Sequence, residues 1–228
     1  MSWLTDAYKS PVTKKAVMAI TGIILFGFVL MHMAGNLKLY LGQQALNHYA
    51  EGLRTLGEPF IPHGQALWIA RFVLLAAVIL HIWSAWQVSR LSLQARPQKY
   101  VKHQFIQATY ASRTLRWGGV IILLFVIYHL LHLTFGTVHP SFVQGDVYHN
   151  VVAGFQVPWV AAFYILANVM LGFHLYHGLW SMFQSLGWNH PSIKGFRRPF
   201  AAVFALVITA GNISFPLAVL FGLVSLPS

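Results

Sequence analysis

Five long apolar runs, almost free of charged side chains, constrain the fold of this sequence more than any other feature. The hydrocarbon core of a bilayer requires about 20 consecutive, mostly apolar residues of α-helix. The runs cover residues 16–38, 67–89, 117–137, 159–183 and 200–224. We therefore predict an all-α membrane protein in which five transmembrane helices form a single transmembrane domain over residues 1–228.

The composition excludes several classes of protein. Hydrophobic residues make up 57% of the chain and charged residues 8%, whereas an average soluble domain is about 25% charged. A soluble globular enzyme and a disordered basic tail are both excluded by these values. Because the chain has no cysteine, it can form no disulfide, no cysteine-ligated iron–sulfur cluster and no covalent attachment of c-type haem.

The net charge of +11 is explained by membrane topology. Nucleic-acid binding requires basic side chains clustered on a surface exposed to water, but here they lie between apolar runs. With a cytoplasmic N-terminus, 12 of the 15 Lys and Arg residues lie inside and only Lys38, Arg54 and Arg71 lie outside. Since cytoplasmic loops are enriched in Lys and Arg, we predict this orientation, an outer C-terminus and no nucleic-acid partner. The basic face, including the long segment 92–116, can contact acidic lipids or a cytoplasmic partner.

Six of the twelve histidines lie inside four of the five runs: His32, His81, His129, His132, His174 and His177. Ionisable residues within a membrane are costly and need partners. Hydrogen bonds between helices would satisfy each imidazole, and a proton relay is a second explanation, although relays usually use carboxylates and no run contains one. The third explanation is haem b, whose iron two histidines on facing helices can bind.

The depths of these histidines favour two haems bound between the first four helices. At 1.5 Å per residue, His81 lies roughly 13 Å from the inner end of its helix and His32 roughly 25 Å from that end. The first and third helices would bind one haem, and the second and fourth helices the other. Residues three apart share a helix face, so spacing does not choose between His129 and His132. Depth slightly favours His132.

Sequence motifs in the first four helices carry a resemblance to a known family. They are H-M-A-G-N at 32–36, I-L-H-I-W-S-A-W around His81, S-R-T-L-R-W-G-G-V at 112–120, and G-F-H-L-Y-H-G-L-W-S-M-F-Q-S-L-G-W at 172–188. The chain resembles the di-haem cytochrome b membrane anchor of succinate dehydrogenase and fumarate reductase, in its single-subunit, five-helix type. The resemblance implies a succinate:quinone oxidoreductase in the cytoplasmic membrane, whose flavoprotein and iron–sulfur subunits bind on the cytoplasmic side.

The resemblance also implies roles for individual residues. His32 and His129 would bind the iron of the distal haem, and His81 and His174 that of the proximal haem. The family pattern thus prefers His129 to His132 and His174 to His177, which become supporting or packing residues. Quinone chemistry near the distal haem is implied for an acidic residue after the first helix, with Glu51 the nearest match and Glu58 the second. Some relatives carry a glutamate of a proton path two residues before the fourth-helix ligand, where this chain has Gly172.

Two other functions remain compatible with the residues. One is the di-haem, quinone-reactive anchor of a hydrogenase or formate dehydrogenase, and the other is a haem-free transporter. In the preferred interpretation the chain passes electrons between an iron–sulfur subunit and a membrane quinone through two haems b. It contains no flavin-binding fingerprint and no cysteine, so we expect no dicarboxylate-oxidising site within it.

Overall fold

The described part of the chain is entirely helical, which confirms the all-α prediction. The computed structural model describes residues 10–95, 110–188 and 190–227. Across these residues the order of elements is α2 (Pro11–Asn36), η1 (Leu37–Leu41), α3 (Gln43–Gly52), α4 (Gln65–Gln94), α5 (Tyr110–His129), η2 (Leu130–Thr134), α6 (Val147–Phe155), α7 (Pro158–Ser185) and α8 (Pro191–Leu220). η2 is a single π-helical turn that continues α5.

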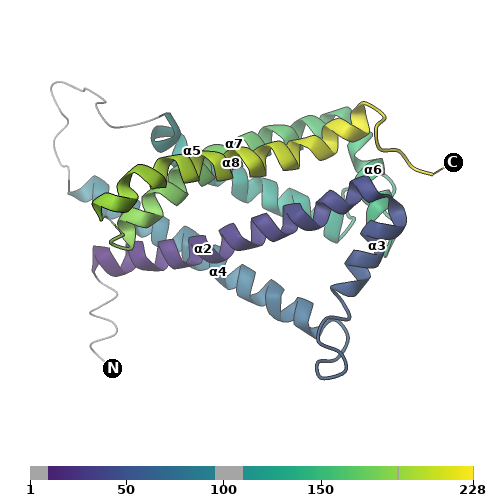
Figure 1. The fold of residues 1–228 in the computed structure, drawn as a ribbon, viewed down its shortest axis with the longest axis horizontal. Helices are drawn as coiled ribbons and strands as arrows, with labels where there is room; N and C mark the ends of the chain where they lie inside the picture. Colours follow the sequence, from purple (N-terminus) through teal and green to yellow (C-terminus); the bar gives the residue numbers. More distant parts are fainter. Residues whose placement is uncertain (1–9, 96–109, 189, 228) are drawn as a thin grey trace.

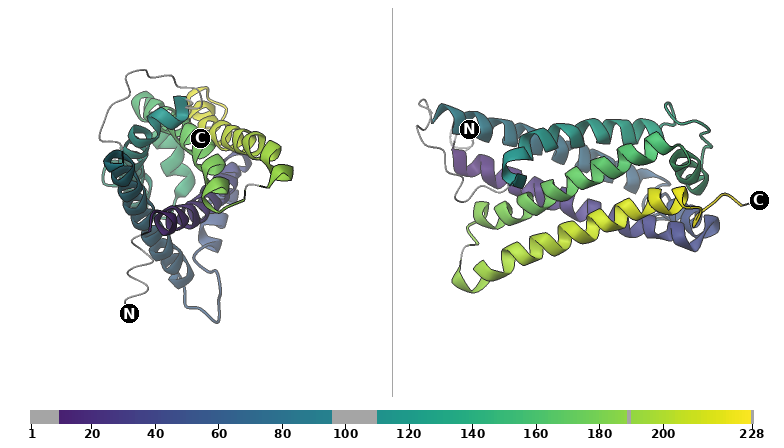
Figure 2. Two further views of the ribbon diagram at one scale, coloured as in Figure 1. Left: turned by 90° about the vertical axis from the view of Figure 1, so that its left-hand side faces the viewer. Right: turned by 90° about the horizontal axis from the view of Figure 1, so that it is seen from above.

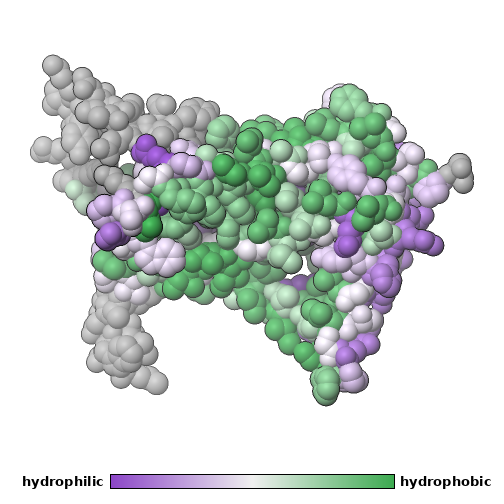
Figure 3. All heavy atoms as spheres, in the orientation of Figure 1, coloured by the Kyte–Doolittle hydropathy of each residue, from purple (hydrophilic) through white to green (hydrophobic). Residues whose placement is uncertain are grey.

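Five helical segments are long and apolar enough to cross a membrane: Pro11–Leu41, Gln65–Gln94, Trp117–Thr134, Pro158–Ser185 and Pro191–Leu220. They run back and forth along the molecule, with α3, α6 and the C-terminal residues gathered at one end (Figures 1 and 2). Hydrophobic side chains form a belt around the middle, and hydrophilic ones lie toward the two ends (Figure 3). Large apolar side chains of these helices, such as Phe72, Leu124 and Leu206, are exposed, as expected for side chains that face lipid.

Proline and capping residues fix where three of the helices begin. Ser10 accepts a hydrogen bond from the backbone N–H of Val12, and Pro11 begins α2. Pro158 and Pro191 stand in the first turns of α7 and α8. Proline suits this position because its fixed φ fits a helix and the first turn needs no N–H donor there.

The observed helix ends differ most from prediction at α8. This helix begins at Pro191 and ends at Leu220, whereas the uncharged run predicts residues 200–224. The predicted run stopped at charged residues, but a charged residue does not end a helix. Arg197 is buried in the protein, and the guanidinium of Arg198 lies 4.7 Å from the centre of the Trp180 ring. The segment 92–116, proposed above as a docking surface, lies partly outside the described residues, since 96–109 are not described.

Small residues allow close contact between neighbouring helices. α7 packs along α8, α4 along α2, and α5 along α7. A side chain at Gly172 of α7 would collide with Thr209 of α8, and one at Gly211 of α8 would collide with Met33 of α2. Such close approach between backbones is typical of packed membrane helices. Gly172 therefore has a packing role between α7 and α8.

A polar cluster ties α3 to α6 at the end of the molecule opposite the N-terminus. The carboxylate of Asp146 caps α6 by accepting from the backbone N–H of His149 (2.9 Å), and it also accepts from the side chains of Gln43 and Asn47 (2.8 Å each). Burial alone would raise the pKa of Asp146, but these three hydrogen bonds and the nearby His149 hold it below its usual value. The cluster is therefore strongest with Asp146 ionised.

Replacing Asp146 tests this cluster. Asp146→Ala should reduce the free energy of unfolding by about 1 kcal/mol, the typical value of a helix N-cap, while Asp146→Asn keeps a capping oxygen and should cost less. The ionised carboxylate makes its full contribution to the free energy of unfolding at pH values above its unfolded-state pKa. This contribution disappears as the pH falls through its lower folded-state pKa. Thermal unfolding of the detergent-solubilised protein over a pH series should therefore show a smaller acid-induced loss for Asp146→Asn than for the wild type. Parallel pH curves would contradict this role.

The contact of Gly172 with Thr209 gives a second prediction. Gly172→Ala should destabilise the protein by about 1–3 kcal/mol, because the added methyl group overpacks the interface between α7 and α8. Gly195→Ala is the matched control, since no atom lies within 4 Å of a Cβ built at this exposed helical glycine. Alanine there should be neutral or stabilising by up to about 1 kcal/mol. Equal thermal unfolding temperatures for the two variants would refute the packing role of Gly172.

Candidate functional site

The structure brings the side chains of His32 and His129 together. Their ring centres lie 5.8 Å apart and the ring planes are nearly perpendicular, at 89°. His32 comes from the C-terminal half of α2, and His129 is the last residue of α5. Phe28 stacks on His32 at 5.3 Å, and Phe125 lies 5.8 Å from His129. A contact between the first and third membrane helices is thus centred on two imidazoles.

A second pair joins the second and fourth membrane helices. The ring centres of His81 on α4 and His174 on α7 lie 6.2 Å apart, with an angle of 64° between the planes. Gly22 of α2 lies beside this pair, because a Cβ built on it would approach Cε1 of His81 to 3.4 Å. All four histidines that the family pattern assigns as ligands therefore lie in two pairs, and the pairing of helices is the one that their depths predict.

The separation of the rings fits two histidines on opposite sides of one metal ion. An imidazole nitrogen binds a first-row metal such as zinc at about 2.0–2.1 Å, so two such rings have centres roughly 6 Å apart. No group of three or more His, Cys, Asp or Glu side chains that could hold a metal ion occurs among the described residues. Haem suits a two-residue site because the porphyrin supplies the other four nitrogen ligands. The residues present therefore fit haem better than a bare metal ion.

The hydrogen bonds of His81 involve Nδ1 and leave Nε2 free to bind a metal. Nδ1 of His81 lies 3.0 Å from the backbone carbonyl of Met18 and 3.3 Å from Oγ1 of Thr21. A carbonyl only accepts, so Nδ1 is the protonated nitrogen and Nε2 keeps its lone pair. Metal-binding histidines usually donate their second N–H to a carbonyl, carboxylate or water in this way. Nδ1 of His174 is buried, with no hydrogen-bond partner in the described part of the chain.

His129 and His132 both reach the hydroxyl group of Tyr164. The distances from Nδ1 to this oxygen are 3.3 Å for His129 and 3.0 Å for His132. His132 is fully buried and stacks on His139, with ring centres 4.7 Å apart. The two histidines do share the face that points to Tyr164, as their spacing predicts, but the ring beside His32 is that of His129. The choice of His129 over His132 as the iron ligand stays a prediction.

His177 follows His174 by one turn on α7. Its ring contacts Trp180 edge-on, with centres 5.8 Å apart, and its buried Nδ1 has no hydrogen-bond partner among the described residues. Sequence reasoning did not identify Met18 or Tyr164 as partners of the paired histidines. A backbone carbonyl leaves no signal in a sequence, while a tyrosine hydroxyl inside an apolar span is a signal that could have been followed.

Glu51 and Glu58 lie in a surface cluster of charged side chains. Glu51, near the end of α3, accepts a hydrogen bond from Arg54 at 2.8 Å. His63 approaches both carboxylates, with Nδ1 at 3.2 Å from Glu58 and Nε2 at 3.8 Å from Glu51. The side chains of His63 and Glu51 are more than half exposed. The structure therefore brings Glu51 of α3 and Glu58 of the segment between α3 and α4 together around one histidine.

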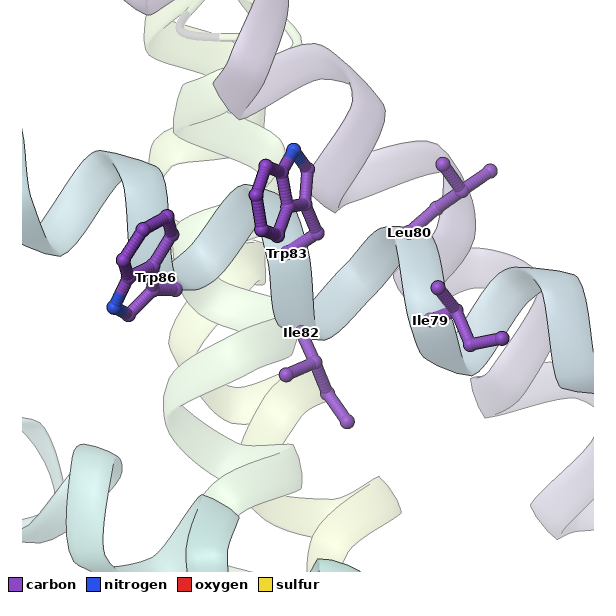
Figure 4. A pocket seen from close by; sticks show the side chains of 5 residues that line it. All are labelled: Ile79, Leu80, Ile82, Trp83 and Trp86. Atoms are coloured by element: carbon purple, nitrogen blue, oxygen red, sulfur yellow. The ribbon is translucent and has the colours of Figure 1, made fainter.

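Two apolar hollows occur elsewhere on the described surface. One, of about 490 Å³, is lined by Ile79, Leu80, Ile82, Trp83 and Trp86 of α4, whose side chains leave the helix in several directions (Figure 4). The other, of about 300 Å³, is lined by Tyr128 of α5 and by Trp159, Val160 and Phe163 of α7. None of the paired histidines lines either hollow. Both are open apolar surfaces within the lipid-facing belt.

One of three comparisons with known proteins gave a match. The family model of the succinate dehydrogenase/fumarate reductase transmembrane subunit matches residues 92–213, which is more than half of the 228 residues. The matched region contains His129, Tyr164 and His174, while His32 and His81 precede it. Neither the curated proteins nor the solved structures gave a match. The chain belongs to the family of succinate dehydrogenase/fumarate reductase transmembrane subunits.

Proposed function

We propose that this protein is the di-haem cytochrome b anchor of a succinate:quinone oxidoreductase, with His32 and His129 binding one haem and His81 and His174 the other. The observation that carries the proposal is the presence of two histidine pairs, 5.8 and 6.2 Å between ring centres, on four different membrane helices. When bound, the two haems supply one-electron carriers between the two faces of the membrane. Each pair would hold the iron of one haem through two histidines and leave no open position for oxygen, which favours electron transfer over oxygen chemistry.

The protein's own contribution is to place and shield these sites. His81 is oriented by the carbonyl of Met18 and the hydroxyl of Thr21, and His129 by the hydroxyl of Tyr164. A Cβ built at Gly27, Gly119 or Gly178 would meet no neighbouring group within 4 Å, so these glycines leave open space on α2, α5 and α7. The surrounding apolar helices exclude water, which keeps the local dielectric constant low.

Electrons enter and leave through partners at the two ends. The basic end, with Arg90 and Arg198 among its residues, would face the cytoplasm and contact the iron–sulfur and flavoprotein subunits, and the C-terminus would lie outside, in a cytoplasmic membrane. Dicarboxylate chemistry belongs to the flavoprotein. At the other end, Glu51 and Glu58 around His63 form an exposed group that could exchange protons with a membrane quinone. Glu51 follows the helix that carries His32, which supports a quinone site near the distal haem.

Paired histidine substitutions test the assignment of ligands. The wild-type complex should show a b-type α band in a reduced-minus-oxidised spectrum and two haems per chain. His32→Ala and His129→Ala should each remove one haem, and the double variant should lose no more than either single variant, because both residues bind the same iron. His81→Ala and His174→Ala should behave alike toward the other haem. His132→Ala is the control and should retain both haems.

Three results would contradict the proposal or part of it. A wild-type chain without a b-type α band would favour a haem-free transporter. If the double variant with His32→Ala and His129→Ala lost both haems while each single variant lost one, the assignment of these two histidines to the same iron would be refuted. Co-purification with nickel or molybdenum subunits, in place of a flavoprotein, would instead identify the anchor of a hydrogenase or formate dehydrogenase.

A further inference from the structure

The hydroxyl group of Tyr164 lies between two histidines of the third membrane helix and its π-helical continuation. Tyr164 is 4% exposed and belongs to α7. Its oxygen is 3.3 Å from Nδ1 of His129 and 3.0 Å from Nδ1 of His132. A phenol group has one proton to donate, and its oxygen can also accept. Among the described residues this hydroxyl has no other hydrogen-bond partner, so its proton goes to one of the two histidines and its oxygen accepts from the other.

Binding of iron by His129 selects one direction. If Nε2 of His129 binds iron as a neutral imidazole, Nδ1 must carry the proton and donate it to the oxygen of Tyr164. The hydroxyl proton of Tyr164 then points to His132, whose Nδ1 accepts. The opposite direction would place the proton of His129 on Nε2, where it would block a metal bond. This step rests on the function proposed above.

The packing around His132 holds its ring in place to accept this bond. His132 is fully buried, and a Cβ built on Gly154 would come within 2.9 Å of its Nε2. His139 stacks on it at 4.7 Å. His139 itself is fixed, since Nε2 donates to the carbonyl of Asn150 at 2.7 Å and Nδ1 accepts from the backbone N–H of Ser141 at 3.0 Å. His132 therefore has little room to turn away from Tyr164.

We propose that Tyr164 and His132 act together as positioning residues that hold His129 in the tautomer with the proton on Nδ1, and that they thereby tune the redox potential of the haem at His32 and His129. An acceptor on Nδ1 makes an imidazole a more basic ligand. A more basic ligand stabilises ferric iron more than ferrous iron and so lowers the potential. The second pair lacks this arrangement, because His81 donates to a backbone carbonyl.

Redox titration of the purified complex tests the role of Tyr164. Tyr164→Phe should keep both haems but reduce the preference of the His32–His129 haem for the ferric state by about tenfold, which is 59 mV upward for a one-electron couple. The potential of the other haem should not change. Tyr128→Phe is the matched control, because Tyr128 lies in the same aromatic cluster and stacks on His132 at 5.5 Å, while no hydrogen bond joins its hydroxyl to a histidine among the described residues. Its potentials should match the wild type.

Two nearly isosteric variants of His132 test the direction of the hydrogen bonds. His132→Asn retains an acceptor for Tyr164 and should keep the wild-type potential. His132→Leu removes that acceptor. Without a hydrogen bond to donate, the hydroxyl oxygen of Tyr164 becomes a weaker acceptor for Nδ1 of His129, so the potential should rise in the same direction as in Tyr164→Phe. If Tyr164→Phe loses the haem altogether, the difference in potential between His132→Asn and His132→Leu still shows whether the hydrogen bond from Tyr164 to His132 tunes this haem.

The inference is overturned if Tyr164→Phe and Tyr128→Phe give the same potentials, or if the two His132 variants behave alike. In both cases a wild-type complex with two haems would leave the proposed function standing. A wild-type complex without haem would overturn the proposed function, and this inference with it.

Discussion

The cost of placing imidazole groups in a hydrocarbon environment governs the arrangement of this helical bundle. An ionisable side chain within a membrane needs a partner, because the surrounding lipid offers none. Four of the six intramembrane histidines meet in pairs across helices, and His132 reaches Tyr164 and stacks on His139. Each pair fixes the rotation of two helices about their axes. The histidines therefore constrain which faces of α2, α4, α5 and α7 point inward.

The two pairs are held by chemically different partners. His81 donates to a carbonyl within α2, a group that no side-chain substitution removes and whose position follows the helix itself. His129 depends on Tyr164, a side chain that can donate or accept and that is shared with His132. The first arrangement is set by backbone geometry and the second by packing of side chains. Two similar pairs thus differ in how firmly their tautomers are defined.

The sequence allowed the helices and the histidine pairing to be predicted, but not the partners of the histidines. Long apolar runs mark membrane helices because charged residues are excluded from lipid. Between His129 and His132, the motif favoured the histidine whose ring lies beside His32, and the depth comparison, which assumed a regular helix, favoured the other; a π-helical turn begins directly after His129. The start of α8 at Pro191 was misjudged because charged residues interrupt an apolar run without ending a helix. α6 is too short to stand out as an apolar run.

The polar cluster at Asp146 also constrains the pair formed by His32 and His129, although these residues are far from it in the sequence. It holds α3 to α6, and Tyr148 of α6 adds a backbone hydrogen bond to Asn47 of α3 at 3.0 Å. α3 follows α2 after only the turn η1, and α6 precedes α7 by two residues. The cluster therefore links the end of the helix that carries His32 to the start of the helix that carries Tyr164. Since Tyr164 contacts His129, the same link limits how far His32 and His129 can separate.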